Sequence, residues 1–250
     1  MTSDAETTPF ANRTVSELSY FDQRKAYLAD NRRFHDQDYV DHPFLFCSRQ
    51  AFQSSLFRIR LYEKILGVHG AIVECGVHRG NNFMLFNQLA AIYEPYNLTR
   101  QIIGFDTFGG FASIDDKVDV GATAQHFSDS NLPDIQAALR LLDMNRPIPN
   151  VPRGELVQGD ALQTIPAYIE RNPHLIVALL YIDFDIYKPC LAALQHLVPL
   201  MPKGAIIAFD EANVRHWPGE TKAIKEFFQL NRLRIERMPF EAYASYAVIE

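Results

Sequence analysis

The chain reads Val73-Glu74-Cys75-Gly76-Val77-His78-Arg79-Gly80 at residues 73–80. An apolar run ends there beside an acid, and two glycines follow before a stretch of helical periodicity begins. Glycine adopts backbone conformations that a Cβ blocks, so Gly76 and Gly80 can carry the chain through a tight turn and let a ligand approach main-chain amides. The stretch therefore predicts a strand, a glycine turn and a helix, as in the first unit of a nucleotide-binding α/β fold.

From this stretch to the C-terminus, short apolar runs alternate with stretches of helical periodicity. Alternation of this kind predicts βαβ units and a parallel sheet with helices on both faces. The last two runs follow each other without a helix between them, which predicts an antiparallel end to the sheet. We expect an α/β fold with a seven-stranded, doubly wound, mostly parallel sheet. The predicted strands are 71–75, 101–105, 155–158, 175–183, 205–209, 232–237 and 243–249, and the predicted helices are 82–93, 133–142, 162–171, 189–200 and 220–230.

The first seventy residues differ from the rest in character. Residues 15–34 are charged and aromatic, and residues 48–66 carry apolar side chains at helical spacing. Residues around His42 and Pro43 suggest a connecting loop. We expect two domains: an N-terminal helical extension over 1–69 and the α/β domain over 70–250.

Composition excludes several classes of protein. Of the 250 residues, 48% are hydrophobic and 22% are charged, which is typical of an ordinary globular protein. The net charge of −6 argues against nucleic acid or an anionic membrane surface as the main partner. The three cysteines, Cys47, Cys75 and Cys190, lack the spacing of a disulfide framework or a zinc site, so we expect a cytoplasmic protein.

Acidic residues follow most of the predicted strands, at the edge where open parallel sheets bind ligands. Asp106 ends the second strand, where an acid can hold two ribose hydroxyls. Its distance from Gly76 is longer than a dinucleotide fingerprint requires, which argues against a dehydrogenase. Gly159 and Asp160 follow the third strand, and Asp160 suits an adenine contact and a helix cap equally well.

Paired acids follow the fourth and fifth strands: Asp183 with Asp185, and Asp210 with Glu211. Neighbouring parallel strands lie about 4.8 Å apart, so these carboxylates converge if the two strands are adjacent. Carboxylates so close repel one another unless they are protonated or hold a cation, and all-oxygen ligation favours Mg²⁺. The alternative is a set of helix caps and solvated strand ends.

These motifs together resemble those of the class I S-adenosylmethionine-dependent methyltransferases, and in particular the macrocin-type sugar O-methyltransferases of the tylosin, mycinamicin and novobiocin pathways. The resemblance rests on the acid and glycines of the first turn, on Asp183-Phe184-Asp185-Ile186-Tyr187, on the acidic pair after the fifth strand, and on Phe105–Phe111, where Thr107 replaces a serine. Two departures are Glu211 in place of aspartate and Phe184 in place of glycine.

The resemblance implies a role for each motif. Asp183, Asp210 and Glu211 would bind Mg²⁺, and Asp185 would be the general base, with His216 as a second candidate. Residues 107–131 form a predicted lid. Candidates for the acceptor site are Arg215, Trp217, Tyr20, Phe44, Phe46 and Tyr62. The predicted S-adenosylmethionine-binding residues are Glu74, Gly76, Val77, Gly80, Asp106, Thr107, Phe108, Gly159, Asp160 and Asp183.

The function that we expect is Mg²⁺-dependent methylation of a deoxysugar hydroxyl in antibiotic biosynthesis, on a nucleotide-linked sugar or a glycoside. One alternative is a catechol or another small diol as the acceptor, although catechol-type enzymes place a lysine where this chain has Ile186. The other alternative is a nucleotide-binding module without catalytic activity. We also expect a homodimer or a larger homo-oligomer, with residues 10–66 covering the acceptor site and contacting the partner copy.

Overall fold

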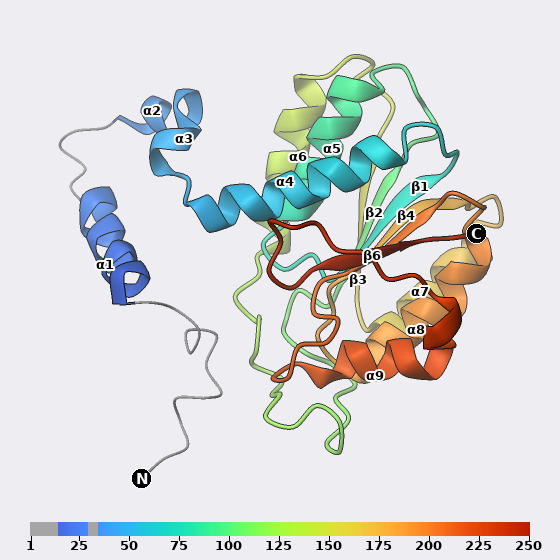
Figure 1. Cartoon of the computed structure of the whole chain (residues 1–250). Helices are drawn as coiled ribbons and strands as arrows, with labels where there is room; N and C mark the ends of the chain where they lie inside the picture. The colour runs from blue at the N-terminus through green and yellow to red at the C-terminus, as the bar shows by residue number, and fades with distance from the viewer. Residues whose placement is uncertain (1–14, 30–34) are drawn as a thin grey trace, which may run out of the picture. The chain divides into compact units, whose positions relative to one another are not determined.

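The computed structural model describes residues 15–29 and 35–250 (Figure 1). The chain forms two compact units, an N-terminal unit that ends at Phe52 and a sheet unit that begins at Gln53. The division lies before the predicted boundary at residue 69, because helix α4 (Arg49–Lys64) continues into the sheet unit. Phe57, Leu61 and Tyr62 of α4 are fully buried in the core of that unit.

The N-terminal unit contains three helices before α4: α1 (Val15–Ala29), α2 (Asp36–Asp41) and α3 (Pro43–Phe46). The sequence predicts a loop around His42, and the structure has two short helices there. The backbone N–H of His35 donates to Asp38 Oδ2 over 2.8 Å, and Pro43 occupies the first turn of α3, where a missing N–H costs nothing. The end of the helix predicted over 15–34 lies outside the described residues.

The sheet unit holds a six-stranded sheet in the order β3-β2-β1-β4-β5-β6. All neighbouring strands are parallel except β5 and β6, which are antiparallel. The strand order reverses between β1 and β4, and this switch point is where such sheets bind ligands. The strands are β1 (Ala71–Cys75), β2 (Ile102–Asp106), β3 (Gly154–Gln158), β4 (Val177–Ile182), β5 (Ile206–Phe209) and β6 (Ser245–Val248).

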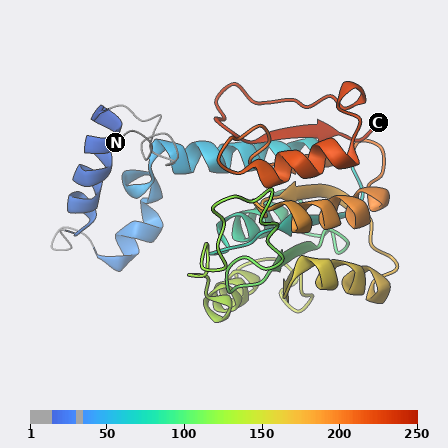
Figure 2. The same ribbon diagram turned by 90° about the horizontal axis from the view of Figure 1, so that it is seen from below.

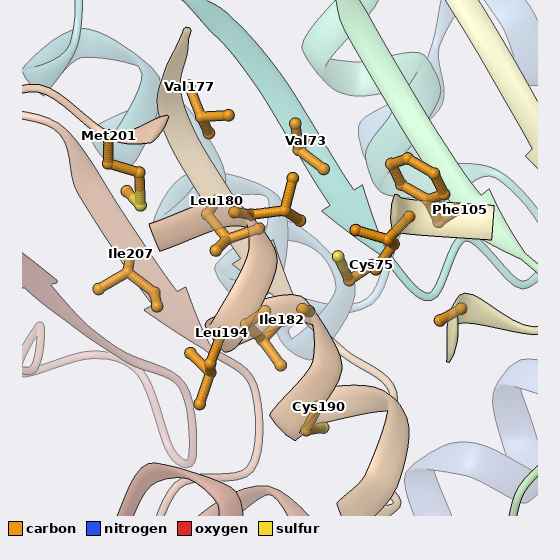
Figure 3. Close-up of a cluster of buried hydrophobic side chains, with 14 of the residues drawn as sticks. Val73, Cys75, Phe105, Val177, Leu180, Ile182, Cys190, Leu194, Met201 and Ile207 are labelled. Carbon is orange, nitrogen blue, oxygen red and sulfur yellow. The ribbon is translucent and has the colours of Figure 1, made fainter. Parts of the chain in front are cut away.

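Two hydrophobic cores cover the two faces of the sheet. One core packs α4, α5 and α6 against one face, and the other packs α7, α8 and α9 against the opposite face. Figure 3 shows part of the second core, where Cys75 of β1, Phe105 of β2 and Leu194 of α8 converge. Helices α8 and α9 lie side by side in both views (Figures 1 and 2). The helices not yet given bounds are α5 (Asn81–Tyr93), α6 (Leu132–Met144), α7 (Ala161–Arg171), α8 (Tyr187–Leu197) and α9 (Pro218–Phe227), with short 3₁₀ helices at Val198–Leu200 and Leu230–Arg232.

A seven-stranded sheet is not confirmed, because the sixth predicted strand, over 232–237, is missing from it. That segment forms one isolated antiparallel bridge, in which the backbones of Glu236 and Tyr246 exchange hydrogen bonds of 2.7 and 2.9 Å. Its neighbour Leu230–Arg232 is helical, which leaves too few extended residues for a ladder. Among the described residues, no helix is both long and apolar enough to cross a lipid bilayer.

Candidate active site

One cavity of about 380 Å³ lies at the carboxyl ends of the strands. Its lining comes from the segments that follow β1, β2, β3, β4 and β5, and from α4. The predicted site residues that line it are Gly76, Val77, Asp106, Thr107, Gly159, Asp160, Asp183, Asp185, Asp210 and Glu211. The predicted residues outside the lining are Glu74, Gly80, Phe108 and His216. The strand-end argument therefore brings most of the predicted residues into one cavity.

The glycine turn after β1 lies against the end of β4. Gly76 has a φ of 102°, and a Cβ on this residue would stand 1.8 Å from the backbone oxygen of Asp183. Gly80, at a φ of 84°, precedes the first turn of α5, and a Cβ there would stand 2.8 Å from Ile135 Cγ2. Only glycine fits at Gly76, since both the backbone conformation and the clash with main-chain atoms exclude a side chain.

The carboxylate of Asp106 holds this turn in place. Its Oδ2 accepts the backbone N–H groups of Val77 and His78, both over 2.8 Å, and its Oδ1 accepts that of Phe108 over 2.6 Å. A carboxylate oxygen accepts more than one hydrogen bond, so these contacts leave room for a ribose hydroxyl. Phe108 itself is buried in the core, which explains why it does not line the cavity.

Asp160 is the N-cap of α7, as its helix-cap interpretation predicts. Its Oδ1 accepts the backbone N–H of Leu162 over 3.0 Å. Its Oδ2 accepts a hydrogen bond from the hydroxyl of Ser113, which belongs to the segment after β2. Asp160 therefore joins the end of β3 to the predicted lid and also faces the cavity.

Glu74 lies inside the protein, behind the glycine turn. It is completely buried, and burial raises the pKa of its carboxyl well above the usual range, although the nearby charge of Arg58 opposes this rise. The predicted contact of Glu74 with the donor stays a prediction.

Three carboxylates meet where β4 and β5 end. Oxygens of Asp183, Asp185 and Glu211 all lie within 4.8 Å of one another, and this is the one such acidic group in the described part of the chain. Burial, followed by the charge of Asp210, raises the pKa of Asp183 well above its usual range. Burial also raises the pKa of Glu211 well above the usual range and that of Asp185 to about 7. Buried carboxylates that repel one another in this way favour protonation or a bound cation.

Asp210 forms an ion pair with an arginine of the protein, Arg58. Its Oδ1 lies 2.8 Å from Arg58 Nη2 and accepts the hydroxyl hydrogen of Tyr181. The guanidinium of Arg58 lies 4.8 Å from the centre of the Tyr181 ring, and Arg58 is 5% exposed. The prediction grouped Asp183, Asp210 and Glu211, whereas the structure groups Asp185 with Asp183 and Glu211. The ligand set and the role of Asp185 stay predictions.

Arg58 and Glu220 are parts of the site that sequence reasoning missed. The structure pairs Arg58 with Asp210. Glu220, in the first turn of α9, is fully buried, and its Oε1 accepts the backbone N–H of Glu211 over 3.0 Å. An acid in a first helical turn is common, so only the burial of Glu220 distinguishes it. The available signal for Arg58 in the sequence was its charge, because it lies among the apolar side chains of residues 48–66.

The predicted lid, residues 107–131, lies at the carboxyl end of the sheet, where Figures 1 and 2 draw it in green. The buried carboxylate of Asp119 accepts the backbone N–H of Tyr187, at the start of α8, over 2.9 Å. Asp129 lies 2.7 Å from His78 Nε2 and also pairs with Arg79. The segment is thus attached to both sides of the cavity, and Phe111 and Phe127 line it.

The remaining acceptor-site candidates of the sheet unit, Tyr62, Arg215, His216 and Trp217, do not line the cavity. Tyr62 is buried in the core and donates its hydroxyl hydrogen to Glu94 over 2.6 Å. His216 is half-buried, with its ring 6.4 Å from that of Trp217. Tyr20, Phe44 and Phe46 belong to the N-terminal unit.

The model of the macrocin-O-methyltransferase family (TylF) matches residues 17–245 of the chain. The chain belongs to this family. It is an S-adenosylmethionine-dependent O-methyltransferase, and its sheet has the α/β methyltransferase fold. The family resemblance predicted from the sequence is thereby confirmed.

Solved structures agree with the family. A crystal structure of CalS11, a calicheamicin methyltransferase, is 30% identical in sequence, covers 99% of this chain and 97% of that chain, and has a TM-score of 0.91. The apo structure of CalS11, described as a TDP-rhamnose 3'-O-methyltransferase, is 29% identical, covers 95% and 96%, and has a TM-score of 0.82. The O-methyltransferase NovP, at 18% identity, 79% coverage of both chains and a TM-score of 0.62, shares the fold. No match was found among curated protein sequences.

Proposed function

We propose that this enzyme methylates a hydroxyl of a deoxysugar in antibiotic biosynthesis and that it uses a hard divalent cation, Mg²⁺ first. The observation that carries the proposal is that the acidic group of Asp183, Asp185 and Glu211 lines the same cavity as the glycine turn. A donor site and an all-oxygen cation site beside each other are what metal-dependent O-methylation requires. The family and the two CalS11 structures support a sugar as the acceptor.

The donor would lie against the glycine turn. Bound S-adenosylmethionine would supply an electrophilic methyl group. The cavity comes close to the backbone here because Gly76 has no side chain, and Asp106 keeps the amides of Val77 and His78 fixed. Asp106 would also accept a hydrogen bond from a ribose hydroxyl, and Asp160 would face the adenine.

The cation would be held by Asp183, Asp210 and Glu211. When bound, a hard divalent cation supplies positive charge that lowers the pKa of an alcohol hydroxyl. The donor set fits such an ion, because it offers only carboxylate oxygens: those of Asp183 and Glu211 lie within 4.8 Å of each other, and burial and the charge of Asp210 raise the pKa of both. Asp210 uses Oδ1 for both Arg58 and Tyr181, which leaves Oδ2 for the cation.

Asp185 would accept the proton of the acceptor hydroxyl. Burial raises the pKa of this carboxyl to about 7, so it is a stronger base than an exposed aspartate. Its backbone, at a φ of 59°, is in the left-handed region, which turns the chain sharply between β4 and α8. Ile186 is buried, at the position where catechol-type enzymes place a lysine. A carboxylate base acting on an alkyl hydroxyl therefore fits this chain better than a catechol mechanism.

The chain would act as a homodimer or a larger assembly in the cytoplasm. Val40, Phe44 and Leu45 of the N-terminal unit are 70%, 72% and 62% exposed, and a partner copy would cover them. Cysteines 47, 75 and 190 are free thiols, in keeping with a reducing compartment. Replacing Phe44 and Leu45 by serine should lower the mass measured by light scattering; an unchanged mass would place the contact elsewhere.

The function is tested by a methyl-transfer assay over nucleotide-linked deoxysugars, deoxysugar glycosides and catechols. Each acceptor is assayed after removal of metal ions with a chelator and again after Mg²⁺ is added back. We expect methylation of a sugar hydroxyl that disappears with the chelator and returns with Mg²⁺. Methylation of catechols alone would favour the alternative acceptor class, and full activity with chelator would contradict the cation.

A further inference from the structure

Three aromatic rings gather at one side of the cavity. The centre of the Phe111 ring lies 5.4 Å from that of Phe127 and 5.8 Å from that of Trp217, and the last two are 6.2 Å apart. Phe111 and Phe127 line the cavity. We call these three rings the aromatic wall.

The backbone of the lid has an unusual conformation at Phe127 and next to Phe111. Phe127 has a φ of 56°, which is rare for a bulky residue, and it is nevertheless 42% exposed. Gly110, at a φ of 96°, lets the two arms of the lid touch, since a Cβ there would stand 1.9 Å from the oxygen of Ala124. Neither burial nor an easy backbone accounts for Phe127, and such strain is typical of ligand-contacting residues.

The segments that carry the aromatic wall contact the backbone at and beside the proposed base. Trp217 immediately precedes α9, and a Cβ on Gly219 of that helix would stand 2.7 Å from the backbone oxygen of Asp185. On the lid side, Asp119 binds the backbone N–H of Tyr187, two residues after Asp185. Both segments that carry the rings are therefore fixed at the acidic group.

The two sides of the cavity differ in charge and polarity. Six carboxylates line it: Asp106, Asp160, Asp183, Asp185, Asp210 and Glu211. Arg58 and Arg79 also line it, and each is paired with a carboxylate of the protein. The phenylalanine rings, in contrast, offer no hydrogen bond.

We propose that the aromatic wall receives the deoxygenated edge of the sugar acceptor and makes the enzyme selective for it. This inference rests on the proposed function. A pyranose with its C2 and C3 hydroxyls at the acidic group presents C5 and its substituent at the opposite edge of the ring. A methyl group there packs on Phe111 and Phe127, the two rings of the wall that line the cavity, whereas a hydroxyl would lose hydrogen bonds to water and neither phenylalanine ring offers a replacement.

The experiment compares two acceptors that differ only in the hydroxyl at C6. An apolar pocket discriminates against one added hydroxyl by up to about 100-fold. We therefore expect kcat/KM of the wild-type enzyme to be roughly 10- to 100-fold higher for the 6-deoxyhexose. Each sugar is offered both as a neutral glycoside and as a nucleoside diphosphate sugar, which separates the effect of the C6 group from that of the carrier.

The decisive variant is Phe127→Asn. Asparagine tolerates a positive φ, so the fold is preserved while the wall gains a hydrogen-bonding side chain. We expect the preference in kcat/KM for the 6-deoxy sugar to fall to about 3-fold or less, because the added hydroxyl now has a hydrogen-bond partner. A preference of that size corresponds to less free energy than one ordinary hydrogen bond contributes. Binding of S-adenosylhomocysteine should be unchanged. Tyr96→Asn, at a residue that is 74% exposed and outside the cavity lining, is the matched control and should keep the wild-type preference.

Three results would overturn the inference. The first is an undiminished preference in Phe127→Asn, and the second is equal rates for both sugars in the wild-type enzyme. The third is a large loss of S-adenosylhomocysteine affinity in Phe127→Asn, which would assign the wall to the donor. Methylation of neither sugar by the wild-type enzyme is a different outcome, because it would contradict the proposed function itself.

Discussion

The two halves of the cavity hold their carboxylates in opposite ways. In the donor half, at the ends of β1 to β3, Asp106 accepts three backbone N–H groups, and Asp160 accepts one together with the hydroxyl of Ser113. In the metal half, at the ends of β4 and β5, Asp183, Asp185 and Glu211 face one another. The carboxylates of the proposed donor half are satisfied by hydrogen bonds, whereas those of the proposed metal half repel one another and would be stabilised by added positive charge.

The difference teaches that similar strand-end acids need not have similar roles. A carboxylate that accepts backbone N–H groups stabilises the local chain and is negatively charged without strain. Buried carboxylates resist ionisation: burial raises the pKa of Asp185 to about 7, and the nearby charges of Asp210 and Asp106 add to the rise. Changes in the donor half should therefore affect donor binding, and changes in the metal half should affect cation binding and proton transfer.

The largest effect is expected for Asp185→Asn. An amide cannot take up the acceptor proton, and the loss of a general base typically lowers kcat by about 10²- to 10⁴-fold. Metal affinity, measured by calorimetry with Mg²⁺, should change by less than about tenfold, or 1.4 kcal/mol, if Asp185 is the base and not a ligand. His216→Ala, outside the cavity lining, provides the comparison.

Two outcomes would reject this division of roles. Loss of Mg²⁺ binding together with turnover would make Asp185 a ligand, as its place in the acidic group allows. Near-normal turnover in Asp185→Asn with a large loss in His216→Ala would move the base to the segment after β5.

The next largest effect is expected for Arg58→Met, which removes the cation that the metal half already contains. Removal of one partner of a buried ion pair costs about 3–5 kcal/mol, and we expect the lower end because the side chain of Asp210 is 24% exposed. The free energy of unfolding, measured with urea and a chelator, should fall by about 3 kcal/mol. Added Mg²⁺ should restore part of it.

Arg60→Met is the matched control, since Arg60 lies on the same helix and pairs with Glu63 at the surface. It should change the free energy of unfolding by less than about 0.5 kcal/mol. Equal effects of the two substitutions would show that Asp210 does not need Arg58.

A smaller effect is expected for Asp106→Ala in the donor half. The substitution removes hydrogen bonds to a charged group, which are worth about 1.5–3 kcal/mol, and loosens the glycine turn. The affinity for S-adenosylhomocysteine, measured by calorimetry without metal, should weaken accordingly. The control is Glu170→Ala, at an exposed position of α7, and this variant should bind S-adenosylhomocysteine as the wild type does. Donor binding that survives Asp106→Ala intact would separate Asp106 from the donor site.

The smallest effect is expected for the free energy of unfolding when the pH changes by one unit. The pKa of Asp185 is about 7 in the folded protein and about 4 in an unfolded chain, so between these values the folded state binds more protons. Without a divalent cation, this group makes stability fall as pH rises from about 4 to about 7, by at most about 1.4 kcal/mol per pH unit. The difference in unfolding free energy between the wild type and Asp185→Asn isolates this contribution. A difference that is constant over this range would contradict the raised pKa.

Sequence reasoning succeeded where the determining contacts are local. The glycine turn and the acids that end the strands follow from patterns within a few residues, and the structure places most of these acids in one cavity. It failed where the partner is distant. Arg58 and Asp210 are separated by 152 positions, and nothing in either segment indicates their pairing. The prediction of a strand over residues 232–237 failed for a related reason, because this segment had suitable side chains but lacked a continuous pairing partner.

The central claim, that the metal half holds a cation and the donor half does not depend on it, is tested most directly with Glu211→Gln. Calorimetry measures the binding of Mg²⁺ and, separately, of S-adenosylhomocysteine to this variant and to the wild-type enzyme. A neutral amide replaces a carboxylate ligand of a hard cation, so we predict a large loss of Mg²⁺ affinity with unchanged binding of S-adenosylhomocysteine. Unchanged Mg²⁺ affinity in Glu211→Gln, or loss of both ligands together, would contradict the account.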